Sequence, residues 1–345
     1  MDATHAHVPQ PDAGRHFDAV FTALSFWIVC GAYLDAWAHR HLDTALETFF
    51  TPWHAVLYSG FFAAASYLGW HLFRAHAAGG RTWLESVPKH YRWAALGVAL
   101  FMLGGALDAW WHLTFGVEKD VDALLSPTHL LLAVGTTLIV SGPYRAALHR
   151  PSSESPTGIR ASLITVLSLT LTLSVITFMT QFTHPFVDGY VGVRPDQSVL
   201  ERLESLSISS VIIQSAFMVG LVLLAVRRWK LPLGSMTILL TVNALWLSFM
   251  ADRFEFVAGA FLAGVCADLL LRQLGTPIKE PVALHLFGFA LPVLYHLFYF
   301  LILRETIGFW WSVHLWTGTI FIAGLVGLMV SYIVHPLKNP DEGTH

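Results

Sequence analysis

Charged residues and cysteine are both scarce in this chain. Only 12% of its 345 residues are Asp, Glu, Lys or Arg, against about 25% in an average soluble domain, which excludes a fully water-exposed surface. The two cysteines, Cys30 and Cys266, both lie in apolar runs, and this excludes a disulfide framework and a zinc ribbon. The formal net charge of -3 leaves no basic field for nucleic acid.

Apolar residues dominate the composition instead. They make up 55% of the chain, and the mean hydropathy is +0.58. A helix needs about 20 largely apolar residues to cross a bilayer. The sequence contains ten such runs, at 17–38, 52–73, 92–113, 127–148, 161–183, 206–227, 231–251, 254–272, 282–303 and 309–334. We therefore predict an all-α integral membrane protein with about ten transmembrane helices.

The distribution of Lys and Arg predicts the orientation of these helices. Most of these residues lie in the two tails and in the loops after even-numbered runs, and cytoplasmic loops carry the excess of positive charge. Both termini are therefore predicted on the cytoplasmic side of the cell membrane. The expected parts are a polar tail (1–16), a four-helix membrane half (17–149), a cytoplasmic linker (150–160), a six-helix membrane half (161–335) and a second tail (336–345).

An internal repeat stands out in the first half. The segments GAYLDAWAH, ending at His39, and GGALDAWWH, ending at His112, share the pattern Asp-x-x-x-His. Each is followed by an acidic loop and then by Thr/Ser-Pro-x-His, which ends at His54 in the first copy and at His129 in the second. Repetition of both pieces in the same order predicts two equivalent helical hairpins.

Helix geometry predicts that each hairpin gathers three ligand-type side chains. Residues four apart share a helix face, so Asp35 lies beside His39, and Asp108 lies beside His112. A Thr or Ser followed by Pro is a typical helix start, which puts the last histidine of each copy in the first turn of the returning helix. Two imidazoles and one carboxylate suit copper, zinc or non-haem iron. We therefore predict metal ligands on the outer side of the membrane, and the alternative is a purely structural Asp–His network.

A third copy is degenerate. His296 ends the segment PVLYH, in which Pro292 stands where the other copies have Asp, and His314 follows after a loop. His184 occupies the corresponding helix end in another hairpin, with Asp188 close in sequence. We predict His296 and His314 as further metal ligands, and His184 and Asp188 as weaker candidates.

The repeated motif resembles the C subunit of the copper membrane monooxygenases, the methane and ammonia monooxygenase family. The stretch LDAWAHRHLDTALETFFTPWHAVLYSGFF carries the resemblance most closely, and its Asp35, His39 and His54 match that subunit's copper ligands. The stretch from Leu107 on resembles the second site of that subunit, with Asp108 where the family has Asn. The likeness covers about residues 31–60 and 104–135.

This resemblance implies copper, dioxygen chemistry and a small apolar or ammonia-like substrate. The chain departs from the family in its larger number of helices and its third histidine pair. It also lacks the periplasmic cupredoxin-like domain that the family's B subunit supplies. Additional subunits or an electron donor are therefore expected partners besides the lipid bilayer, and a homo-oligomer stays open.

Four functions fit these observations. The first is a membrane metalloprotein with an outer-side His/Asp centre, acting as a copper- or iron-dependent oxidoreductase of the monooxygenase type. The runner-up is a metal ion transporter or metal-acquisition protein that captures copper or zinc at the outer face. A haem protein and a structural or sensory subunit complete the set. We favour the first, because it uses both the repeated carboxylates and the histidines.

Overall fold

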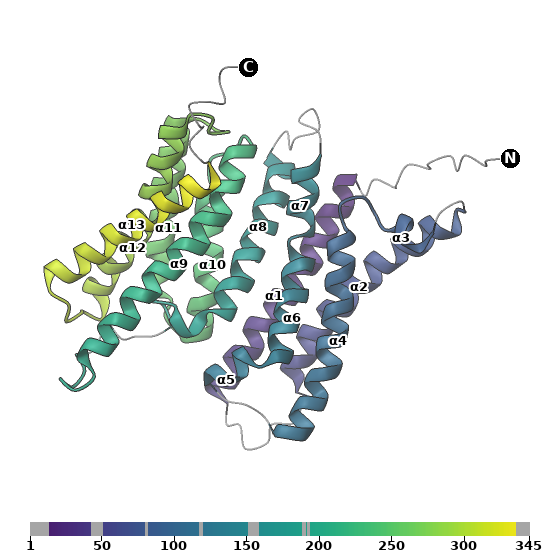
Figure 1. The fold of residues 1–345 in the computed structure, drawn as a ribbon, viewed down its shortest axis with the longest axis horizontal. Helices are drawn as coiled ribbons and strands as arrows, with labels where there is room; N and C mark the ends of the chain where they lie inside the picture. Colours follow the sequence, from purple (N-terminus) through teal and green to yellow (C-terminus); the bar gives the residue numbers. More distant parts are fainter. Residues whose placement is uncertain are drawn as a thin grey trace, which may run out of the picture. The chain divides into compact units, whose positions relative to one another are not determined.

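The structure is a computed structural model that describes residues 14–42, 51–79, 82–116, 120–150, 159–187, 191 and 194–335. Regular secondary structure in these ranges is helical throughout (Figure 1). The elements are α1 (Gly14–His41), α2 (Pro52–Ala77), α3 (Trp83–Ser86), α4 (Arg92–Phe115), α5 (Asp120–Leu125), α6 (Pro127–Val140), α7 (Gly142–His149), α8 (Ile159–Met179), η3 (Gln181–Thr183), α9 (Leu200–Arg228), α10 (Ser235–Ala251), α11 (Glu255–Leu274), α12 (Pro281–Thr306) and α13 (Val313–Val334).

Every predicted apolar run coincides with one of these helices or with the pair α6 and α7. Within the described residues, seven helices are long and apolar enough to cross a membrane, and the α6–α7 pair, bent by 46°, makes up to eight. Helix α2 has 26 residues but is not among these seven, and α10 has only 17 residues. The chain is thus a multi-pass helical membrane protein by length and composition, while the number of ten spans stays a prediction.

The chain divides into two compact units, residues 1–175 and 176–345, and the division falls inside α8. In the first unit, α1 packs along α2, and α4 packs along α6. In the second unit, the neighbouring pairs are α10 with α11 and α12 with α13, and α9 packs on α13. Most of the predicted linker, 151–158, lies outside the described residues. Both copies of the repeated motif belong to the first unit.

One glycine in each motif hairpin allows its two helices to approach closely. A Cβ atom on Gly31 of α1 would lie 2.5 Å from the Leu57 Cα atom of α2. In the second hairpin, a Cβ atom on Gly104 of α4 would lie 3.1 Å from the Leu132 side chain of α6. Both glycines stand four residues before the Asp of their motif, so the carboxylate follows one turn after the close approach. The glycines therefore hold each Asp against the neighbouring helix.

Replacing Gly31 with alanine is expected to destabilise the first hairpin. The added methyl group meets backbone atoms that cannot rotate away, and such overpacking costs about 1–3 kcal/mol. The matched control is Gly69→Ala in α2, because nothing lies within 4 Å of a Cβ atom there, and alanine favours the helix. Thermal unfolding in detergent should show a lower midpoint for Gly31→Ala and no loss for Gly69→Ala. Equal midpoints would contradict the packing argument.

Candidate metal centres

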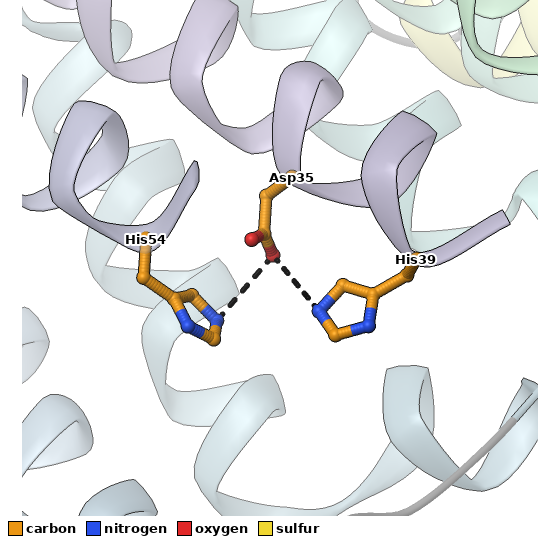
Figure 2. A group of neighbouring side chains, drawn as sticks. All are labelled: Asp35, His39 and His54. Atoms are coloured by element: carbon orange, nitrogen blue, oxygen red, sulfur yellow. Dashed lines mark ion pairs between the residues drawn. The ribbon is translucent and has the colours of Figure 1, made fainter. Parts of the chain in front are cut away.

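The first centre lies where the end of α1 meets the start of α2. Asp35 and His39 come from α1, and His54 comes from the first turn of α2 (Figure 2). Asp35 Oδ2 lies 3.6 Å from His39 Nε2 and 3.4 Å from His54 Nε2. Figure 2 shows the carboxylate directed between the two imidazole rings. The three ligand atoms all lie within 4.8 Å of one another.

The second centre repeats this arrangement between α4 and α6. Asp108 and His112 come from α4, and His129 comes from the first turn of α6. Asp108 Oδ2 lies 3.5 Å from His112 Nε2, and Asp108 Oδ1 lies 3.6 Å from His129 Nε2. The ligand atoms again fall within 4.8 Å of one another. The structure thus brings together the three predicted residues of each motif copy, in two separate centres.

The two centres also share the orientation of their rings. The planes of the two imidazoles make an angle of 60° in each centre, and the ring centroids are 5.9 Å apart in the first and 5.7 Å in the second. The same helix start positions the last histidine in both, since its backbone N–H donates to Thr51 Oγ1 in one centre and to Ser126 Oγ in the other. The local motif therefore reproduces the same geometry twice.

Hydrogen-bonding groups surround the second centre. Thr128 donates to Asp108 Oδ1 at 2.8 Å, and its hydroxyl oxygen lies 3.2 Å from Ser126 Oγ. Ser126 Oγ lies 2.7 Å from His129 Nδ1 and can accept a hydrogen bond from it. In the tautomer that carries hydrogen on Nδ1, the Nε2 atom of His129 presents a lone pair to the centre.

His112 has a comparable contact on its Nδ1 side. Its Nδ1 atom lies 3.3 Å from the carbonyl oxygen of Gly116, and a carbonyl can only accept. A neutral His112 with hydrogen on Nδ1 would present the lone pair of its Nε2 atom toward Asp108. Outer contacts of this kind, with Nδ1–H donating to oxygen, are typical of metal-binding histidines.

The centres differ in enclosure. The Asp108 side chain is 3% exposed, whereas that of Asp35 is 16% exposed. His39 is the most exposed ligand of the first centre, at 35%. Where the second centre has Thr128 donating to the carboxylate, the first has Trp53, which lacks a hydroxyl group. The second centre is thus the more buried one.

The third motif copy does not form such a centre among the described residues. His314 is exposed, while His296 is fully buried and lies 3.1 Å from Ser215 Oγ through its Nε2 atom. The reason is a shift of one residue: His314 comes two positions after the helix cap Ser312, where His54 and His129 come three positions after theirs. One residue rotates a side chain by about 100° around a helix. Leu315 therefore occupies the ligand position.

The two weaker candidates for metal ligands are His184 and Asp188. His184 is buried, and its Nδ1 atom accepts a hydrogen bond of 3.2 Å from the Phe186 backbone N–H, so it supports the turn that follows η3. Asp188 lies outside the described residues. In the described part of the chain, the two centres are the groups of three or more ligand-type side chains that are close enough to share an ion.

The chemistry of the donor set fits a transition metal. Two ligand atoms that each lie about 2.0–2.2 Å from one ion, at angles of 90–109°, are about 3.0–3.5 Å apart. The Asp–His separations of 3.4–3.6 Å match this spacing and are longer than an ordinary hydrogen bond. Imidazole and carboxylate donors without sulfur suit Cu(II), Zn(II) or non-haem iron.

Sequence reasoning missed three polar groups of the first unit and one aromatic. Asp18 at the start of α1 accepts a hydrogen bond of 2.7 Å from the Tyr91 hydroxyl and forms an ion pair with Arg150. No local pattern joins these distant positions. Tyr58, one turn after His54, was also missed, although its place on the same helix face was a usable signal.

Comparison with known proteins does not assign the chain to a family. No protein-family model, no curated protein and no solved structure matches it. The evidence for function is therefore the geometry of the two centres.

Proposed function

We propose that this protein is a membrane metalloprotein whose two His/His/Asp centres hold copper, and that it acts as an oxygen-dependent oxidoreductase on a small apolar substrate. One observation carries the metal assignment. In the second centre, the Nε2 atoms of His112 and His129 face the Asp108 carboxylate at 3.5 and 3.6 Å, which is longer than an ordinary hydrogen bond. Two imidazole nitrogens and one carboxylate oxygen directed at a common point are the donor set of a transition-metal ion.

The chain's own residues prepare this centre for a cation. Asp108 supplies negative charge that offsets the charge of the ion, and Thr128 holds the carboxylate in place. Ser126 Oγ and the Gly116 carbonyl contact the Nδ1 atoms of the two imidazoles, so that the Nε2 atoms are the ones directed at the centre. Bound copper would supply redox and dioxygen chemistry. The helices that carry the centre are apolar, and such surroundings favour an apolar substrate.

The choice of copper and oxygen chemistry is supported by the resemblance of both motif stretches to the copper membrane monooxygenase C subunit. The excess of Lys and Arg in the even-numbered loops supports cytoplasmic termini and centres on the extracytoplasmic side of the cell membrane. By analogy with that family, an electron donor or further subunits complete the activity.

Transport of the metal is the alternative, and the placement of polar residues weighs against it. An ion path would need polar groups that continue from the centres across the membrane. The polar side chains within the apolar helices of residues 176–345 are held by structural partners instead: Gln181 by Phe178 O, Gln214 by Thr180, Asn243 by Thr177, Asp268 by the start of α10, and His285 by Ser331.

Metal analysis of the purified protein tests the proposal. After loading with copper and removal of loose metal, we expect two copper ions per chain and a Cu(II) paramagnetic resonance spectrum with nitrogen splitting. The matched control is His314→Ala, which removes the exposed histidine of the third copy and should retain both ions. Absence of stoichiometric metal would overturn the assignment. Exclusive binding of zinc would overturn the redox function and favour transport or hydrolysis.

A further inference from the structure

Tyr58 contacts the first centre directly. It lies on α2 one turn after His54, and the two rings meet edge-on with centroids 6.4 Å apart. The imidazole of His54 is in turn held by its place in the first turn of α2. Any ligand that fixes the His54 ring therefore also restricts the ring of Tyr58.

The other side of Tyr58 touches the helix of the second centre. A Cβ atom on Gly105 of α4 would lie 3.2 Å from the Tyr58 hydroxyl oxygen and from its ring, so the absence of a side chain at this position makes room for the phenol. Gly105 stands three residues before Asp108 on α4. Tyr58 also packs edge-on against Phe101 of α4, with ring centroids 5.8 Å apart.

Aromatic packing adds a second contact between α2 and α4. Phe101 stacks on Phe61 of α2 with centroids 4.1 Å apart, and both side chains are buried. A continuous series of contacts thus connects the His54 ring, through Tyr58, to the α4 backbone one turn before Asp108. Both motif carboxylates lie within electrostatic range of the phenol, in agreement with a position between the centres.

We propose that Tyr58 couples the two centres, so that a metal ion bound at either one strengthens binding at the other. This rests on the proposed function of both centres as metal sites. An ion at the first centre orders His54, and through Tyr58 it orders α4 at Gly105 and Asp108. The second ion then meets a centre whose ordering cost is already met. Such coupling is reciprocal by thermodynamic necessity.

Copper titrations against a competing chelator test the coupling. His39→Ala disables the first centre without changing a contact of Tyr58, and we expect it to weaken copper binding at the second centre by about fivefold or more. In a Tyr58→Leu background, the same His39→Ala change should alter that affinity by less than about twofold. The matched control is Tyr67→Leu, because Tyr67 lies on the same helix but packs against Phe17; coupling should persist there.

A second measurement does not depend on the folding of Tyr58→Leu. In His129→Ala protein only the first centre can load, and added copper should slow hydrogen–deuterium exchange of the α4 amides around Gly105. Unchanged exchange, or coupling that persists in Tyr58→Leu, would overturn the role of Tyr58. Two loaded centres with independent affinities would overturn the coupling and leave the metal centres standing, whereas failure of the wild type to bind copper would overturn both.

Discussion

Replacement of Asp108 by alanine is expected to empty the second centre, so that copper at saturation falls from two ions per chain to one. Asp108 faces both imidazoles of its centre and receives the Thr128 hydrogen bond. Loss of an outer-shell partner alone costs about 10–100-fold in metal affinity, and loss of the ligand itself should exceed the upper end of that range. Elemental analysis together with paramagnetic resonance would measure the effect.

Two further variants show whether the loss is specific. Asp35→Ala should remove the other ion and leave the spectrum of the more enclosed second centre. Thr128→Val keeps all three ligands and removes only the hydrogen bond to the carboxylate, so the stoichiometry should stay at two while the affinity of the second centre falls by about 10–100-fold. Retention of two ions by Asp108→Ala would show that the carboxylate is not a ligand.

Asp18→Ala is expected to produce the largest loss of folding stability. The Asp18 side chain is 5% exposed, forms an ion pair with Arg150, and accepts a hydrogen bond from Tyr91. These residues lie at the start of α1, the end of α7 and the start of α4. Breaking a buried ion pair from one side costs about 3–5 kcal/mol, because the remaining charge loses its partner. Unfolding in detergent should show this loss as a lower midpoint.

The matched control is Glu305→Ala, which removes a carboxylate with a 78% exposed side chain and should change stability by less than about 0.5 kcal/mol. Asp18 stands 17 residues before Asp35 on α1, about 25 Å along the helix. Folded Asp18→Ala protein should therefore still bind two copper ions. An unfolding midpoint equal to that of Glu305→Ala would contradict the structural role of the pair.

The third motif copy shows that matching residue types and spacing do not by themselves predict a metal centre. His296 and His314 have the residue types of the other copies, and the spacing between them is similar. The helix cap decides the outcome, because Ser312 starts α13 one residue too late for His314 to face inward. Counting from the cap, instead of from the preceding histidine, would have shown this in the sequence.

The number of membrane spans shows a second limit of prediction from the sequence. Each apolar run became a helix, because local hydrogen bonding in a run of this length is satisfied within the helix itself. Whether a helix crosses the bilayer depends also on its length and on its mean hydropathy, and neither α10, with 17 residues, nor α2 is among the candidate spans. Apolar character alone therefore predicted helices more reliably than spans.

The sequence by itself determined the parts of the molecule that depend on neighbours within one or two helical turns. These are the positions of the helices, the pairing of Asp35 with His39, and the cap that places His54 or His129 in a first turn. Only the tertiary structure decided which side chains meet across helices: Thr128 with Asp108, Tyr58 with Gly105, and Asp18 with Arg150. The reason is physical: a turn follows from local backbone bonds, whereas contacts between helices depend on the packing of whole surfaces.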